Sequence, residues 1–149
     1  MRVDLPDQAS TERFGAAIAD VLQPGDIVAL SGGLGAGKTT LARAIIGALG
    51  YSGEVPSPTF AIVEIYEPPS LRLPLVHADF YRLASPAELE ELGLDDYLGD
   101  GALIAEWPEK AGGFVHDPAC LSIRLEIEDE RRFAIVEPGA SWLGRVPCP

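Results

Sequence analysis

The spacing of hydrophobic positions predicts two helices and a buried strand in the first third of the chain. Apolar residues recur at helical intervals over residues 11–21, and Ser10 or Thr11 is suited to cap this helix. Residues 27–30 form a fully apolar run, which is typical of a buried parallel strand. A second apolar helical stretch follows a glycine-rich loop and ends near Leu49, just before a glycine.

The remainder of the chain predicts short strands and a terminal hairpin. Residues 85–88, Ser-Pro-Ala-Glu, have the composition of a helix start. Hydrophobic and polar residues alternate over 121–128, and a turn leads from this half-exposed strand into a second one over 132–136. Apolar runs predict further strands at residues 60–66, 73–76 and 102–105. Because no repeat or low-complexity tract divides the chain, residues 1–149 are expected to form one domain.

Composition narrows the class of protein. The 149 residues are 47% hydrophobic and 23% charged, which is enough apolar material for a folded core. The net charge of −12 disfavours a broad nucleic-acid-binding face, so any bound polyanion needs a local device to hold it. No apolar run approaches a membrane span, and the N-terminus lacks a signal-peptide pattern. A cytoplasmic protein is expected, with Cys120 and Cys148 as free thiols.

The strongest chemical signal is the segment Gly32–Thr39, which matches the phosphate-loop pattern G-x-x-x-x-G-K-[ST] between a predicted strand and a predicted helix. Its glycines let backbone N–H groups converge on phosphate oxygens. Lys38 is expected to reach the β- and γ-phosphates, and the Thr39 hydroxyl is expected to bind Mg²⁺. The residues of this segment and the one after it that are expected to bind the nucleotide are Gly33, Gly35, Ala36, Gly37, Lys38, Thr39 and Thr40.

The motif also defines the expected fold and nucleotide. We expect an α/β, P-loop NTPase-like three-layer fold whose mixed, mainly parallel sheet is extended by the antiparallel C-terminal hairpin. Proteins of this class that select guanine read the base with an Asn-Lys-x-Asp motif. The chain contains no Asn, so ATP is the expected nucleotide.

Two carboxylates are candidates for the metal and the attacking water, because a P-loop enzyme needs an acid at the end of a neighbouring strand. Asp79 follows one apolar run, and Glu106 follows a cleaner one. Either acid taken alone is also compatible with an ordinary solvated position at a strand end. His77, two residues before Asp79, is suited either to relay protons or to a purely structural role.

Other segments have two interpretations each. Residues 57–59, Ser-Pro-Thr, are either a mobile switch loop or a plain proline turn. Trp107 either stacks on a base or caps the core. The stretch 88–109 is rich in acids, which indicates either a solvated face or a docking surface for a basic partner.

Four motifs together resemble the TsaE (YjeE) family of bacterial P-loop ATPases over about residues 5–118. They are the phosphate loop, Ser57-Pro58-Thr59-Phe60, His77-Ala78-Asp79-Phe80-Tyr81-Arg82-Leu83 and Ala105-Glu106-Trp107-Pro108, in this order. The combination is far more specific than the phosphate loop alone. The C-terminal hairpin adds little to the resemblance.

The resemblance implies a cytoplasmic ATPase required for the threonylcarbamoyl modification of the tRNA adenosine next to the anticodon. Its implied partners are TsaD-like and TsaB-like proteins, with tRNA engaged only indirectly through the complex and no membrane involved. The family's metal-linked glutamate falls on Glu106, and the aspartate of its H-x-D-x-Y-R motif falls on Asp79. The family's tryptophan falls on Trp107, and a threonine near the nucleotide resembles Thr11.

We therefore expect a Mg²⁺-dependent ATPase, weak alone and dependent on partners, that powers a tRNA-modifying complex. Glu106 and Thr39 are assigned to the metal, Asp79 and Lys38 to catalysis, and Thr11 and Trp107 to nucleotide binding. A small-molecule P-loop kinase and an ATP-binding module without turnover remain the alternatives.

Overall fold

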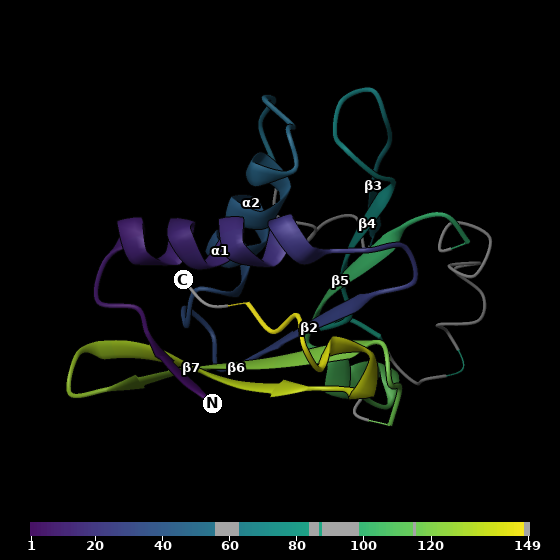
Figure 1. Cartoon of the computed structure of the whole chain (residues 1–149). Helices are drawn as coiled ribbons and strands as arrows, with labels where there is room; N and C mark the ends of the chain where they lie inside the picture. Colours follow the sequence, from purple (N-terminus) through teal and green to yellow (C-terminus); the bar gives the residue numbers. More distant parts are fainter. Residues whose placement is uncertain (56–62, 84–86, 88–98, 115, 148–149) are drawn as a thin grey trace.

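The computed structural model describes residues 1–55, 63–83, 87, 99–114 and 116–147. In these residues one sheet has seven strands in the order β1-β7-β6-β2-β5-β4-β3 (Figure 1). The strands are β1 (Arg2–Asp4), β2 (Ile27–Ser31), β3 (Val63–Tyr66), β4 (Leu75–Asp79), β5 (Ala102–Glu106), β6 (Cys120–Glu128) and β7 (Arg131–Pro138). The helices are α1 (Gln8–Val21) and α2 (Lys38–Ala48), with 3-10 helices η1 (Pro108–Ala111) and η2 (Ala140–Trp142).

The sheet is parallel at its centre and antiparallel at both edges. Strands β6, β2, β5 and β4 run parallel to one another. Strand β7 pairs antiparallel with β6, which confirms the predicted C-terminal hairpin and the mixed, mainly parallel sheet. At the outer edges β1 joins β7 and β3 joins β4, both antiparallel. The pattern along the chain did not predict β1, because three residues are too short to show a period.

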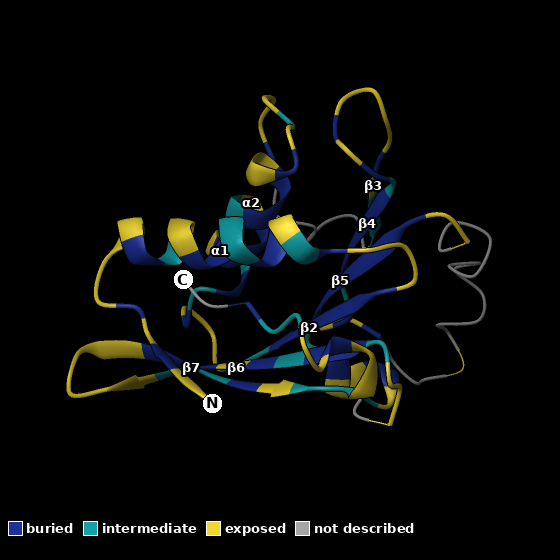
Figure 2. Ribbon diagram, viewed as in Figure 1, coloured by how far each residue is buried: buried dark blue, intermediate teal, exposed yellow. Residues whose placement is uncertain are grey.

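Two hydrophobic clusters cover the two faces of the sheet, because side chains alternate along each strand. Val28 and Leu30 of β2 pack beneath α1 and α2, which lie together on one face (Figure 1). Ile27 and Ala29 face the other way, toward a cluster that includes Phe80 and Ala111 of η1. Strands β2 and β5 are buried along nearly their whole length (Figure 2). The parallel strands are therefore buried on both faces, as the predicted three-layer fold requires, but in the described part of the chain both α-helices lie on one face and η1 packs against the other.

The start of α1 corrects one prediction. The helix begins at Gln8, and its N-cap is Asp7 rather than Ser10 or Thr11. The Asp7 carboxylate accepts the backbone N–H of Ser10 at 2.8 Å, and the Ser10 hydroxyl accepts the backbone N–H of Asp7 at 3.1 Å. This reciprocal capping box satisfies two N–H groups at once, so it fixes the helix start three residues before Thr11.

Other boundaries differ from the prediction for reasons of pairing. The strand predicted over 73–76 is β4, Leu75–Asp79, which starts after Pro74 and pairs in register with β5. Asp79 is thus the last residue of this strand. Strand β3 covers the end of the strand predicted over 60–66, and residues 60–62 lie outside the described part of the chain. The helix start predicted at 85–88 also lies outside the described residues, except for Ala87. Cys148 lies outside them as well.

The two helices pack closely at a glycine. A Cβ atom on Gly15 would lie 2.5 Å from the Cβ of Ala44, so α1 and α2 approach one another where no side chain intervenes. Among the described residues, neither helix is long and apolar enough to cross a membrane.

Candidate nucleotide-binding site

The phosphate loop joins the end of β2 to the start of α2, at the carboxyl edge of the parallel strands. Gly37 is the N-cap of α2 and has a left-handed φ of 108°, which glycine adopts at little cost. A Cβ atom on Gly32 would lie 2.6 Å from the carbonyl oxygen of Leu125, so the loop also passes close to β6. The free N–H groups at the start of α2 are the standard anion site of this loop type.

The ammonium group of Lys38 is enclosed by its own loop. Nζ donates hydrogen bonds to the carbonyl oxygens of Gly32 and Gly33, each at 2.8 Å. It also lies 4.3 Å from the centroid of the Trp107 ring. Burial lowers the pKa of Lys38, and the charges of Glu106, Asp79 and Glu109 oppose this shift. The positive charge is thus held where phosphate oxygens would replace two neutral carbonyls.

Thr39 and Glu106 meet although 67 positions separate them in the sequence. The Thr39 hydroxyl donates to Oε1 of Glu106 at 2.8 Å. Glu106 is the last residue of β5 and is only 2% exposed. Its other oxygen, Oε2, lies 2.6 Å from Nε2 of the buried His77. A hydroxyl and a carboxylate are oxygen ligands of the kind that Mg²⁺ prefers, so the residues present fit the ion.

Asp79 ends the adjacent strand and is paired in register with Glu106. Its Oδ1 atom accepts the backbone N–H of Tyr81 at 2.9 Å. Burial raises the pKa of Asp79 and the charge of Glu106 adds to this effect, whereas the Tyr81 N–H, His77 and Lys38 oppose it. The two predicted acids therefore lie side by side, one buried and one half-buried.

Lys38, Thr39, Asp79 and Glu106 all line one cavity of about 360 Å³. Trp107 forms part of its wall with a left-handed φ of 55°, and its ring centroid lies 4.9 Å from that of Tyr81. The residues lining the cavity are Leu34, Gly35, Gly37, Lys38, Thr39, Thr40, Asp79, Tyr81, Arg82, Glu106, Trp107 and Arg132. Most of the residues predicted from the sequence for nucleotide, metal and catalysis are in this set.

Thr11 lines a second cavity, also of about 360 Å³. This cavity shares Thr40 and Arg132 with the first one, so the two adjoin. The two remaining loop residues predicted to bind, Gly33 and Ala36, line neither cavity. Gly33 accepts a Lys38 hydrogen bond, and Ala36 is buried.

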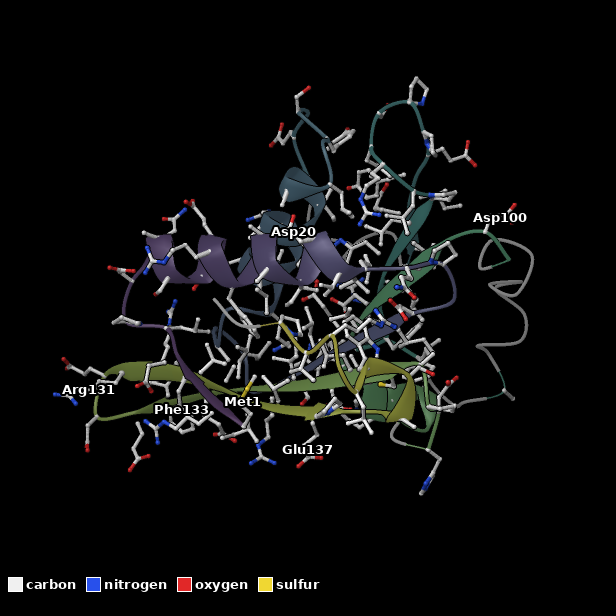
Figure 3. The ribbon with its side chains drawn as sticks, in the orientation of Figure 1. Met1, Asp20, Asp100, Arg131, Phe133 and Glu137 are labelled. Carbon is white, nitrogen blue, oxygen red and sulfur yellow. The ribbon has the colours of Figure 1, made fainter. Side chains whose placement is uncertain are left out.

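Sequence reasoning missed Arg132 as part of this site. It stands on β7, and a Cβ atom on Gly37 would lie 4.0 Å from one of its guanidinium nitrogens. Figure 3 shows the neighbouring Arg131 side chain pointing outward at the tip of the hairpin. No local signal distinguishes these two adjacent arginines, because only the pairing of β7 with β6 and β1 decides which one faces the loop.

Two predicted features, the Ser57-Pro58-Thr59 loop and the first half of the acidic stretch 88–109, lie outside the described residues and stay predictions. Of the acids of that stretch within the described part, Asp100 and Glu109 are exposed. Glu106 is buried, so it belongs to the site rather than to a solvated surface.

A strand, a glycine-rich loop, a helix and a converging lysine, threonine and carboxylate define a P-loop nucleotide-binding protein. A sequence model of the family TsaE, threonylcarbamoyl adenosine biosynthesis protein, matches residues 5–134. The chain belongs to the TsaE family.

Individual relatives agree with this assignment. The tRNA threonylcarbamoyladenosine biosynthesis protein TsaE of Haemophilus influenzae is 38% identical over 134 residues, covering 86% of this chain and 83% of that protein. The protein of the same name from Streptomyces coelicolor is 47% identical over 116 residues, covering 77% and 76%. The crystal structure of Bacillus subtilis YdiB is similar in fold, with a TM-score of 0.74, 27% identity and coverage of 95% of this chain and 88% of that one.

Proposed function

We propose that this protein binds ATP with Mg²⁺, hydrolyses it, and thereby serves the synthesis of threonylcarbamoyladenosine in tRNA. The observation that carries the proposal is the convergence of Lys38, Thr39 and Glu106 at the start of α2, in one cavity. The names of the related proteins in Haemophilus influenzae and Streptomyces coelicolor support the pathway. The phosphate loop supports the nucleotide.

Binding of the nucleotide relies on groups already aimed at the cavity. The N–H groups at the start of α2 hold phosphate oxygens, and Lys38 exchanges its two loop carbonyls for oxygens of the β- and γ-phosphates. Thr39 and Glu106 hold Mg²⁺, directly or through water. Bound there, the ion would neutralise charge that develops on the phosphates.

Asp79 is proposed to orient the attacking water. It is the half-buried acid of the pair, so it remains accessible to solvent, while Glu106 is enclosed. The Tyr81 backbone N–H holds Oδ1, and Oδ2 is proposed to accept the hydrogen bond from the attacking water. This difference in burial supports metal binding by Glu106 and orientation of water by Asp79.

The far end of the nucleotide is assigned to the adjoining cavity. Thr11 and Thr40 line it, and Arg132 stands between it and the phosphate loop. Trp107, on the Lys38 side, closes the phosphate end. The guanidinium group of Arg132 is suited to contact a phosphate at the junction of the two cavities.

Partners are proposed to complete the catalytic site in the cytoplasm. Phosphoryl transfer gains on the order of 10³–10⁵ in rate from an arginine placed on the developing charge. Arg43 is held away, because its Nε donates to the carbonyl oxygen of Val55 at 2.9 Å, and Arg132 is already assigned to nucleotide binding, so the arginine for the developing charge is assigned to a partner. TsaD-like and TsaB-like proteins are the proposed partners, docking on the acidic stretch 88–109. The net charge of −12 is consistent with tRNA being held by those partners.

Release of phosphate from ATP tests the proposal, measured for the protein alone and with each partner present or omitted. We expect slow release alone and faster release with both partners, weakening as salt rises. Transfer of phosphate to a nucleoside or sugar would instead identify a kinase. ATP binding without release under any combination would identify a binding module.

A further inference from the structure

His77 is buried on β4 directly behind the proposed phosphate site. Its exposed fraction is 0%. Because side chains alternate along a strand, His77 and Asp79 project from the same face of β4 as Leu75, which packs in the core beneath α1 and α2. Glu106 ends the adjacent strand opposite Asp79. The imidazole therefore meets this carboxylate from inside the protein.

One hydrogen bond indicates which ring nitrogen of His77 is the donor. Nε2 lies 2.6 Å from Oε2 of Glu106, and the buried Nδ1 has no partner among the described residues. A proton on Nδ1 would leave a buried N–H donor unpaired, which native structures rarely tolerate. An ionised carboxylate can only accept a hydrogen bond, so Nε2 is the ring nitrogen that carries a proton and donates to Oε2 of Glu106.

Both oxygens of Glu106 are consequently held. Oε1 accepts the Thr39 hydroxyl at 2.8 Å, and Oε2 accepts the imidazole N–H. A donor on the far side of a metal-binding carboxylate fixes the orientation in which the carboxylate meets the ion. Asp79 differs, because within the described part of the chain its carboxylate accepts one hydrogen bond, from the Tyr81 N–H.

We propose that His77 is a positioning residue for the metal site. Its Nε2–H holds Oε2 of Glu106, so that Oε1 and the Thr39 hydroxyl are presented together where Mg²⁺ binds. The inference rests on the proposed binding of ATP with Mg²⁺ and adds a buried residue that touches neither.

Metal affinity separates this role from a merely structural one. His77→Leu removes the donor and keeps an apolar side chain of similar size, whereas His77→Gln retains an N–H donor. Tyr66→Phe is the matched control, because the Tyr66 hydroxyl is also buried without a partner among the described residues. Tyr66 pairs with Leu75, at the end of β4 opposite to Asp79. Mn²⁺ affinity in the presence of ADP is measured by electron paramagnetic resonance, and ADP affinity without metal by calorimetry.

We expect His77→Leu to weaken Mn²⁺ binding by about 10–100-fold, the usual effect of removing such an outer donor. His77→Gln should recover most of this loss, and Tyr66→Phe should match the wild type. ADP affinity without metal should change less than about twofold in all three. Unchanged Mn²⁺ affinity in a folded His77→Leu variant, or equal losses in the Leu and Gln variants, would overturn the inference. A wild-type protein that binds neither nucleotide nor metal would instead overturn the proposed function.

The wild-type protein alone provides a second test if the variants do not fold. Nitrogen-15 NMR of labelled histidine distinguishes a protonated from a bare ring nitrogen. We expect Nε2 of His77 to carry a proton, because it donates to Oε2 of Glu106. A bare Nε2 with the ring proton on Nδ1 would contradict the inference, because Nε2 could then not donate to Glu106.

Discussion

Strand β2 has a buried polar cluster at each end, and the two differ in how fully they are paired. At its start, Asp26 accepts hydrogen bonds from Arg145 at 2.6 and 2.8 Å and from the backbone N–H of Gln23 at 2.7 Å. Arg145 also donates to the carbonyl oxygen of Val21 at 2.7 Å and lies 4.1 Å from the Trp142 ring centroid. Every charge in this cluster has its own fixed partner.

At the other end of β2, the polar groups have partners that a ligand can replace. Lys38 is bonded to two carbonyls of its own loop, and Thr39 to the Glu106 carboxylate. Lys38 and Asp79 both have pKa values shifted by burial toward the neutral form. The same strand therefore carries a cluster that stabilises the fold at its start and a cluster that can bind a ligand at its end.

The largest expected effect comes from breaking the first cluster. Arg145→Ala leaves Asp26 buried without its cation, which should lower the free energy of unfolding by about 3–5 kcal/mol. Urea denaturation measures this loss. The affinity for ATP should stay within about twofold of the wild type at temperatures where the variant is folded. A loss below about 1 kcal/mol would show that the cluster does not stabilise the fold.

The second effect is specific to binding. Lys38→Ala should weaken ATP binding at least about tenfold, or roughly 1.4 kcal/mol, because a charge-assisted phosphate contact is lost. Calorimetric titration measures the affinity. The free energy of unfolding should change little, because the lysine's present partners are loop carbonyls. Unchanged affinity in the folded variant would contradict the assignment of the phosphate loop.

Substitutions of the two acids in the nucleotide site are expected to have different effects. Glu106→Ala should raise the Mg²⁺ concentration needed for half-maximal ATP binding by at least the about 10–100-fold expected for His77→Leu, because the oxygen ligand itself is removed rather than its outer support. Asp79→Ala should reduce turnover while ATP affinity stays nearly intact. Mg²⁺ titrations of both variants, followed by phosphate release, measure these effects. If Asp79→Ala abolishes Mg²⁺-dependent binding and Glu106→Ala does not, the two roles are reversed.

The smallest expected effect concerns the hairpin. Arg132→Ala should weaken ATP binding about threefold to tenfold, since one partly exposed contact to a phosphate is lost. Arg131→Ala is the matched control, because that side chain points away from the loop (Figure 3). Calorimetry on both variants provides the comparison. Equal affinities would remove Arg132 from the nucleotide site.

Local features of the site were predictable from the sequence, and distant pairings were not. The phosphate loop is contiguous, so Lys38 and Thr39 could be placed from its pattern. Glu106 follows an apolar run, so its position at a strand end was also predictable, and the structure confirms it. Arg132 and Arg145 depend on where remote segments pack. No periodicity or motif near Arg132 indicates that it lies next to the phosphate loop, and none near Arg145 indicates that it pairs with Asp26.

The start of α1 shows the same limit at short range. Ser10 is a good N-cap residue, but Asp7 offers a reciprocal pair of hydrogen bonds with it, and the pair determines the boundary. For β4, register with β5 carries the strand beyond its apolar run to Asp79. Specific hydrogen-bond pairing therefore determines the boundaries of α1 and β4, which the local sequence alone does not determine.

Thermal unfolding with and without ATP and Mg²⁺ tests most directly whether one cluster stabilises the fold and the other binds the ligand. The Tm without ligand reports stability, and the rise in Tm with ligand reports binding. Arg145→Ala should unfold roughly 6–20 °C below the wild type yet show a clear rise in Tm with ligand. Lys38→Ala should unfold near the wild-type temperature and show little rise. A normal ligand-induced rise in Lys38→Ala, or its loss in Arg145→Ala while the protein is folded, would contradict the account.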